Sequence, residues 1–467
     1  MKLYRNAIIL LVVAALLIGA YFVVKNVKAG QADEDEESKY EDLTDYTSDE
    51  IESLTLENDE GTFVIERKDD DWILSTPTDF KYDSSSLSTI VVNAASVVAD
   101  KVVEEDAQDL SIYGLDDPAV ARLKTKDGTV ISIEIGDKTP TGGGYYVKLE
   151  GSSKVYVIGS LTGEKLLAGK NSMRSKELFD ITSDKITSLT MNRNGSNVFT
   201  AEKDDSSNWT ITSPIRGDAN TSAFSTMLEA LANTTVNEFI DDKPADLSQY
   251  GLDKPAYEFV FNAEGIGEVT LQMGQEKSKG SSIYAKLAGS DEVFTVDISD
   301  YTFLDKPLKE IVNVFAYIVN IDQVKKIELT MDGKTTNMTL DVYKDKEGKL
   351  DSDKDKFYVN GIDASGRDEN DDQPFRKFYQ ALIGITIDEI DLEGKPEGNA
   401  DITIDYTLSD GTMKVEFIPK DENFYYVVRN GEYAGVLVKR KNKTDMGIDG
   451  MKQAYEYMMD FLSKQSK

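Results

Sequence analysis

A short peptide occurs twice in this chain and indicates that the chain is built from repeated units. Residues 111–123 read SIYGLDDPAVARL, and residues 248–260 read SQYGLDKPAYEFV. The two tryptophans, Trp72 and Trp209, lie 137 residues apart (209 − 72), as do Tyr113 and Tyr250 (250 − 113). Two further blocks, Ser-Leu-Thr and a tyrosine-rich stretch, keep the same order at spacings of 135 and 138 residues (188 − 53 and 283 − 145). The sequence therefore predicts an internal duplication.

A third, more divergent copy follows the first two. Residues 327–331 (IELTM), 378–391 and 424–438 resemble blocks of the second copy, but this region has no tryptophan and no Tyr-Gly-Leu-Asp peptide. We predict repeat 1 at residues 50–183, repeat 2 at 184–322 and a divergent repeat 3 at 323–467.

Each copy has the pattern of a sheet packed with one or two helices. Alternating apolar and polar residues predict strands such as IESLTLEN and GTFVIERK, and a third short strand carries the tryptophan. Helices are expected near Ser84 to Ala99 and Ser222 to Ala232. The predicted fold class is α+β: an N-terminal transmembrane helix followed by tandem repeated domains of antiparallel sheet packed with one or two helices.

The Tyr-Gly-Leu-Asp peptide has the spacing of a short helical turn that ends at glycine. We expect Asp109 to be the N-cap, Gly114 to adopt the left-handed conformation after the turn, and Leu115 to pack on Leu110. Pro118 then favours an extended chain that begins a strand. The same motif recurs, in the order of the chain, as Asp246, Leu247, Tyr250, Gly251, Leu252 and Pro255. We interpret these residues, with Tyr113 and the two tryptophans, as a structural motif; a ligand site is the alternative.

The N-terminal residues have the pattern of a membrane anchor. Residues 7–24 carry no charge and follow Lys2 and Arg5, and a helix of this length just spans the hydrocarbon core of a bilayer. We predict a cytoplasmic N-terminus at residues 1–6, a transmembrane anchor in the cytoplasmic membrane at 7–24, an acidic tether at 25–49, and the bulk of the chain outside the cytoplasm. A cleaved signal peptide is the alternative for the apolar segment.

The composition excludes several classes of function. Neither histidine nor cysteine occurs, which removes Ser-His-Asp and Cys-His catalytic groups, disulfides and cysteine zinc sites. The chain has 85 acidic and 52 basic residues, a net charge of −33, which disfavours nucleic acid as a partner. Asp351 to Asp355 resemble the start of a calcium loop but lack its later glycine and glutamate. We expect no cofactor, and assign no catalytic or metal-binding residue.

These features together resemble a bacterial family catalogued as domain of unknown function 4340. The resemblance rests on the anchor, the tandem copies, the tryptophan strand, the Tyr-Gly-Leu-Asp-x-Pro peptide and the segment Met173 to Leu178, and it covers residues 50 to 320 best. It implies a membrane-anchored accessory component that associates with the permease and auxiliary subunit of a gliding-motility-type ABC transporter. The family implies no catalytic residues.

Two further functions stay open from the sequence alone. A cell-surface module that binds wall polysaccharide or peptide is the main alternative, since many of the 23 tyrosines could line a groove. A hydrolase that uses paired carboxylates is a third hypothesis, and no pair of carboxylates can be singled out for it.

Overall fold

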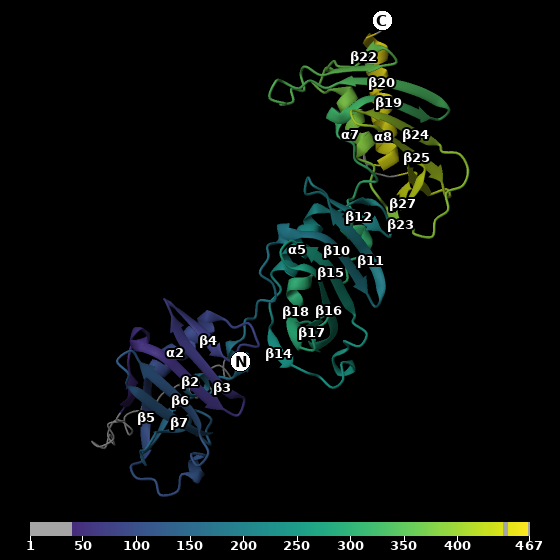
Figure 1. The fold of residues 1–467 in the computed structure, drawn as a ribbon. Helices are drawn as coiled ribbons and strands as arrows, with labels where there is room; N and C mark the ends of the chain where they lie inside the picture. The colour runs from purple at the N-terminus through teal and green to yellow at the C-terminus, as the bar shows by residue number, and fades with distance from the viewer. Residues whose placement is uncertain (1–39, 442–446, 466–467) are drawn as a thin grey trace, which may run out of the picture. The chain divides into compact units, whose positions relative to one another are not determined.

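The computed structural model describes residues 40–441 and 447–465, which form three nine-stranded sheets (Figure 1). All the strand pairings are antiparallel, and few helices accompany them. The chain divides into two compact units between Ser175 and Lys176. The expectation of tandem domains of antiparallel sheet with few helices is confirmed.

The first sheet belongs to the N-terminal unit. Its strand order is β1-β5-β9-β8-β7-β6-β2-β3-β4. The strands are β1 (Glu41–Asp45), β2 (Ile51–Asn58), β3 (Gly61–Lys68), β4 (Asp71–Thr76), β5 (Ser96–Glu104), β6 (Ala119–Thr125), β7 (Val130–Lys138), β8 (Gly144–Leu149) and β9 (Val155–Gly159). The helices are η1 (Ser48–Glu50), α2 (Ser84–Ala95), η2 (Ser111–Tyr113), α3 (Ser160–Leu166) and α4 (Lys170–Met173).

The second sheet opens the C-terminal unit, in the order β13-β12-β11-β10-β15-β16-β17-β18-β14. Its strands are β10 (Ile186–Arg193), β11 (Ser196–Lys203), β12 (Trp209–Ser213), β13 (Gly217–Asp218), β14 (Glu238–Asp241), β15 (Tyr257–Ala263), β16 (Gly267–Ser278), β17 (Ser282–Leu287) and β18 (Val293–Asp297). The helices are η3 (Ser183–Lys185), α5 (Thr221–Ala232), η4 (Ser248–Tyr250), η5 (Ile298–Tyr301) and α6 (Leu308–Ile311).

The third sheet has the order β22-β21-β20-β19-β24-β25-β26-β27-β23. Its strands are β19 (Val324–Met331), β20 (Lys334–Asp341), β21 (Lys356–Val359), β22 (Ile362–Asp363), β23 (Glu389–Ile390), β24 (Ile402–Leu408), β25 (Thr412–Pro419), β26 (Phe424–Arg429) and β27 (Glu432–Lys439). The helices are η6 (Ile321–Gln323), α7 (Pro374–Ile383) and α8 (Gly447–Gln465).

Eight strands have the same order in all three sheets, and only the ninth differs. Read from the edge that carries the aromatic strand, β4-β3-β2-β6-β7-β8-β9-β5 corresponds to β12-β11-β10-β15-β16-β17-β18-β14 and to β21-β20-β19-β24-β25-β26-β27-β23. The ninth strand is β1 in the first sheet, β13 in the second and β22 in the third. The third, divergent copy therefore keeps the topology of the other two.

A helix covers one face of each sheet and supplies part of its core. Asp83 caps α2 by accepting the backbone N–H groups of Ser85 and Ser86, and Asn220 caps α5 in the same way. In the third repeat, α7 packs against α8, where the Phe378 and Tyr455 rings meet edge to face at 5.7 Å. Alternate strand residues point into these cores, as the period of two predicts.

Two sequence predictions for repeat 1 require correction. The tether predicted at 25–49 includes Glu41–Asp45, which instead pairs with β5 and buries Leu43. The helix predicted to run to Ala99 ends at Ala95, because residues from Ser96 onward pair with both β1 and β9. Residues 25–39 of the tether lie outside the described residues.

The predicted anchor, residues 7–24, also lies outside the described residues. Within 40–441 and 447–465, no helix is both long enough and apolar enough to span a bilayer.

An extended segment closes repeat 2 and pairs with the neighbouring repeat as well. On one side, Asn220 N donates to Ile311 O, and Asn313 N donates to Asp218 O, each at 2.8 Å. On the other side, the backbones of residues 314 and 316 bond to residues 387 and 385 of repeat 3, also at 2.8 Å. One continuous strand-like segment therefore joins two repeats, with no linker between them.

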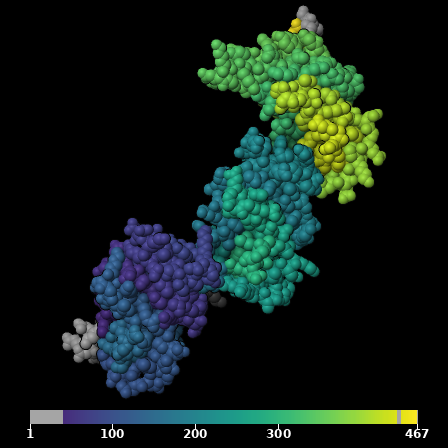
Figure 2. Space-filling view, in the orientation of Figure 1, coloured from purple at the N-terminus to yellow at the C-terminus, as the bar shows by residue number. Residues whose placement is uncertain are grey.

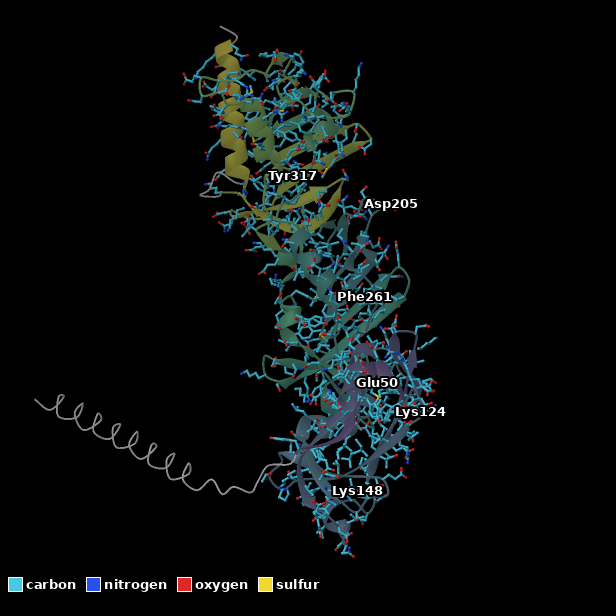
Figure 3. All side chains as sticks on the ribbon, turned by 90° about the vertical axis from the view of Figure 1, so that its left-hand side faces the viewer. Glu50, Lys124, Lys148, Asp205, Phe261 and Tyr317 are labelled. Carbon is cyan, nitrogen blue, oxygen red and sulfur yellow. The ribbon has the colours of Figure 1, made fainter. Side chains whose placement is uncertain are left out.

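Side chains continue this junction into a single core. The second and third repeats share one cluster of buried apolar residues, and in the space-filling view their surfaces touch (Figure 2). Arg429 donates to the Arg216 carbonyl, and Tyr317, labelled in Figure 3, donates to the Leu382 carbonyl at 2.6 Å. Burial raises the pKa of the Tyr317 hydroxyl, so this hydroxyl remains a neutral donor.

Gly435 allows the two repeats to approach closely, and its replacement tests the junction. Its φ is +74°, and a Cβ atom added there would lie 2.3 Å from Ile215 Cγ2. We predict that Gly435→Ala lowers the free energy of unfolding of the C-terminal unit by about 2–3 kcal/mol. Denaturation followed by Trp209 fluorescence, in a Trp72→Phe background, measures this.

The matched control is Gly431→Ala. Gly431 has φ +84°, but nothing lies within 4 Å of an added Cβ. Alanine there adds backbone strain alone, so we expect the free energy of unfolding to fall by only about 1 kcal/mol. Equal losses for the two variants would contradict the close packing at Gly435.

Candidate interaction site

Each sheet places an aromatic residue at the same point of an edge-proximal strand. Trp72 lies opposite Arg67 in β4 and β3, and Trp209 lies opposite Lys203 in β12 and β11. Phe357 holds this position in repeat 3, opposite Leu340. The two tryptophans were evident from their spacing in the sequence, whereas Phe357 was not, because residues 342–355 are inserted before it in repeat 3.

In repeat 1 an arginine covers the aromatic ring. The Arg67 guanidinium lies 5.4 Å from the centre of the Trp72 ring, a cation–π contact. Arg67 also donates to the Ser48 carbonyl at 3.1 Å and to Asp49 Oδ1 at 3.0 Å. Trp72 is consequently only 5% exposed.

In repeat 3 an arginine from a different element performs the same task. The Arg376 guanidinium of α7 lies 5.4 Å from the centre of the Phe357 ring, and Phe375 stacks on that ring at 4.3 Å. Arg376 pairs with the carboxylate of Asp355, which also accepts the Tyr343 N–H at 2.8 Å. Phe357 is 2% exposed.

Repeat 2 differs from both, because its tryptophan is only partly covered. Trp209 packs one side against Phe224, with ring centres 5.3 Å apart, and remains half-buried. It lines a surface hollow of about 630 Å³. Lys203, at the position of Arg67, donates instead to the Asp184 carbonyl.

Repeat 2 and the segment that leads from it into repeat 3 form the walls of this hollow, which we call the Trp209 hollow. Further residues that line it include Ser183, Asp184, Asn208, Asp218, Asn313, Ile318, Asn320 and Gln323. Asp205 lies in the β11–β12 turn beside it (Figure 3). Asn313 belongs to the segment that joins the repeats, so the junction sets the shape of the hollow.

The Trp209 hollow carries more negative than positive charge. Asp184, Asp204, Asp218 and Lys203 line it, three carboxylates against one ammonium. A hydrogen bond from Thr182 lowers the pKa of Asp184, and backbone hydrogen bonds from the β11–β12 turn lower that of Asp204. Both carboxylates are therefore ionised at neutral pH.

The Tyr-Gly-Leu-Asp motif lies elsewhere and forms a helix stop. Gly114 has φ +67°, its N–H donates to Ser111 O at 3.1 Å, and the Leu115 N–H donates to Leu110 O at 3.0 Å. This is the Schellman arrangement. In repeat 2, Gly251 has φ +68°, and Leu252 N donates to Leu247 O at 3.1 Å.

One detail of the motif differs from the sequence prediction. The turn is a 3₁₀ helix whose N-cap is Leu110, with Leu247 as its counterpart. Asp109 accepts the Ser111 N–H at 3.1 Å, and Asp246 accepts the Ser248 N–H at 2.8 Å. The 3₁₀ helix begins only at Ser111, or at Ser248 in repeat 2, so each aspartate lies one residue before the cap.

The tyrosine of the motif docks the turn onto the sheet. The Tyr113 and Tyr146 ring centres are 5.0 Å apart, and Tyr113 donates to Glu104 Oε2 at 2.8 Å. A glycine in the strand below permits this approach, because a Cβ on Gly136 would lie 2.2 Å from the Tyr113 carbonyl oxygen. Tyr250, Tyr284 and Gly274 repeat the contacts in repeat 2.

Each proline of the motif lies within two residues of the start of a strand. Pro118 is followed by β6, and Pro255 lies two residues before β15. The contacts of the whole motif join a turn to a sheet, whereas the Trp209 hollow is lined by other residues.

The residues considered for metal binding have structural contacts instead. Asp351 binds Lys354 at 2.8 Å, and Asp355 is buried with Arg376. Among the described ranges, no group of three or more acidic side chains could hold a metal ion.

Gly114→Ala tests the helix stop. The added Cβ would lie 2.6 Å from Asp137 Cγ at a positive φ, so we predict a loss of about 2 kcal/mol in the N-terminal unit. Thermal unfolding followed by Trp72 fluorescence, in a Trp209→Phe background, measures it. Gly128→Ala is the control, because nothing lies within 4 Å of its Cβ. An unchanged melting temperature for Gly114→Ala would count against the cap.

Comparison with protein families gives two overlapping matches to one family. The model described as "Domain of unknown function (DUF4340)" matches residues 72–255 and 209–368. Together these matches span more than half of the chain. The chain belongs to the DUF4340 family. No curated protein matches the chain, and no solved structure does.

The two DUF4340 matches reproduce the internal repeat. They begin at Trp72 and at Trp209, 137 residues apart (209 − 72). The first ends at Pro255, the last residue of the second Tyr-Gly-Leu-Asp-x-Pro peptide. Each DUF4340 match therefore begins at the aromatic position of one repeat and ends inside the next repeat. The second match, residues 209–368, includes the segment 311–316 that joins repeats 2 and 3.

Proposed function

We propose that this DUF4340 protein is a non-enzymatic, membrane-anchored accessory protein of an ABC transport system. Its repeats lie outside the cytoplasm, and its partners are the transporter permease and auxiliary subunit. The observation that carries the proposal is the direct joining of repeats 2 and 3 through residues 311–316. Such joining builds a continuous surface from small sheets, as proteins that bind other proteins through repeats do.

The distance between the predicted anchor and the first strand supports a partner in the membrane. Residues 25–40 separate the predicted span from β1 at Glu41. Sixteen residues (40 − 25 + 1) reach at most about 55 Å even when fully extended. Repeat 1 is thereby kept near the membrane, where a permease exposes its extracytoplasmic loops.

The first sheet offers a polar face for such contacts. Cross-strand ion pairs with exposed side chains join Glu57 to Arg122 at 2.5 Å and Glu52 to Lys124, labelled in Figure 3, at 2.8 Å. The pair of Glu134 with Lys148, at 2.6 Å, is largely buried and is not part of this exposed face. The residues of the two exposed pairs alternate with buried ones along β2 and β6, so they occupy the face opposite the core. A polar, ordered face suits a reversible protein contact.

Co-purification tests the transporter function. The full chain is extracted from its native membrane in mild detergent, and its companions are identified by quantitative mass spectrometry. We expect a permease and an ATPase at abundances comparable to the chain, and absent from a parallel purification of an unrelated single-span protein. Recovery of the chain without either subunit would contradict the proposal.

The Trp209 hollow favours a second candidate, a cell-surface module that binds wall polysaccharide or peptide. The hollow, of about 630 Å³ and lined by a half-buried tryptophan among polar side chains, is within the size range of ligand sites. This function predicts that the chain is retained on purified wall material, and that Trp209→Ala reduces the retention.

A further inference from the structure

We propose that the Trp209 hollow binds the guanidinium group of an arginine presented by a partner polypeptide. The bound arginine would lie on Trp209 as Arg67 lies on Trp72. This inference names a chemical group that the proposed accessory protein would recognise on a partner. It rests on that proposed function in one respect, namely that the repeats bind a partner protein.

The groups that hold Arg67 in repeat 1 have counterparts in repeat 2. Arg67 contacts the Trp72 ring, the Ser48 carbonyl and the Asp49 carboxylate. Sheet register makes Trp209 the counterpart of Trp72, and η3 (Ser183–Lys185) precedes β10 as η1 (Ser48–Glu50) precedes β2. Ser183 and Asp184 therefore correspond to Ser48 and Asp49, and both line the Trp209 hollow with Trp209.

Repeat 2 has a lysine at the position where repeat 1 has the arginine that covers the tryptophan ring. Lys203 stands where repeat 1 has Arg67, and it donates to the Asp184 backbone carbonyl. An ammonium lacks the planar fork that contacts a ring, a carbonyl and a carboxylate together. The Asp184 carboxylate accepts a hydrogen bond from Thr182 and lies near the charges of Lys185 and Lys203. Its remaining acceptor positions and the open side of Trp209 are the groups that an external guanidinium would contact.

Repeat 3 shows that the arrangement does not depend on where the arginine comes from. Arg376 reaches the Phe357 ring from α7 rather than from the neighbouring strand. It too pairs with a carboxylate, that of Asp355. Aromatic ring, guanidinium and carboxylate therefore meet in two repeats by different routes, and repeat 2 has the ring and the carboxylate.

The charge of the hollow favours a cation over a neutral or anionic group. Three carboxylates and one ammonium line it, and the Arg429 guanidinium, whose charge interacts with that of Asp218, offsets part of this negative charge. The chain as a whole carries a net charge of −33, which draws basic segments toward it. A neutral saccharide would use the tryptophan face and donate hydroxyl hydrogen bonds to the carboxylates, but it would gain no ion pair from them.

Calorimetric titration of the full chain in detergent tests the inference. The probe is acetyl-Gly-Arg-Gly-amide, and its control is the same peptide with citrulline, which has the shape of arginine without the charge. We expect a dissociation constant of about 1 mM for the arginine peptide, since one cation–π contact and one exposed ion pair are weak. Binding of the citrulline peptide should be weaker by about fivefold or more.

Lys203→Arg is the sharpest variant, because it keeps the net charge of the chain. The new guanidinium would cover Trp209 from within, as Arg67 covers Trp72, so we expect binding of the arginine peptide to fall about tenfold. Asp184→Asn should weaken binding about threefold. Asp205→Asn, in the turn beside the hollow, removes one charge without removing a lining group and should leave the dissociation constant within about twofold.

Three outcomes would overturn the inference. Equal binding of the arginine and citrulline peptides would show that charge is not recognised. Unchanged binding to Lys203→Arg would place the peptide elsewhere on the acidic surface. Binding of chitotriose, a neutral oligosaccharide, without binding of the arginine peptide would make the hollow a saccharide site. Co-purification of the transporter is read separately, so either proposal can fail alone.

Discussion

Backbone pairing by residues 311–316 with two repeats at once determines how the second and third repeats meet. The same short segment closes repeat 2 on residues 218–220 and continues on residues 385–387 of repeat 3. Hydrogen bonds on both sides leave the segment little freedom, and its buried residues, Ile311, Val312 and Ala316, extend one core into the next. The walls of the Trp209 hollow depend on this segment, because Asn313 belongs to it and Ile318 and Asn320 follow it directly.

One sheet architecture thus presents an aromatic residue that is covered in repeats 1 and 3 and partly open in repeat 2. Register fixes the position in each repeat, whereas the covering group comes from a facing strand in repeat 1 and from a helix in repeat 3. In repeat 2 the facing residue is Lys203, and Trp209 stays half-buried beside a hollow. The duplicated sheet places an aromatic residue at the same position in each repeat. Whether an arginine side chain covers that residue determines whether it is buried or accessible.

The sequence was sufficient to predict the features that depend on spacing. The two tryptophans, with two copies of one peptide, indicated tandem units. A glycine four residues after one leucine and directly before another indicated the left-handed stop seen at Gly114 and Gly251. These are local features, set by backbone conformation and by the order of residues. The same reasoning placed Asp109 one residue wrongly, because it could not distinguish a 3₁₀ turn from an α-turn.

Features that depend on long-range pairing were missed. Residues Ser96–Glu104 pair with strands formed by residues 41–45 and 155–159, and no local pattern reveals partners so far apart in the chain. Phe357 was overlooked because an insertion separates it from the strand it faces. The open state of Trp209 depends on a change from arginine to lysine that matters only once Arg67 is known to cover Trp72.

Acrylamide quenching of single-tryptophan variants tests the central claim, that Trp209 is accessible while its counterpart Trp72 is sealed. Acrylamide is neutral, so the net charge of −33 does not bias its approach as it would bias that of iodide. The account predicts strong quenching of Trp209 in the Trp72→Phe chain and weak quenching of Trp72 in the Trp209→Phe chain. Equal quenching of the two tryptophans would contradict it.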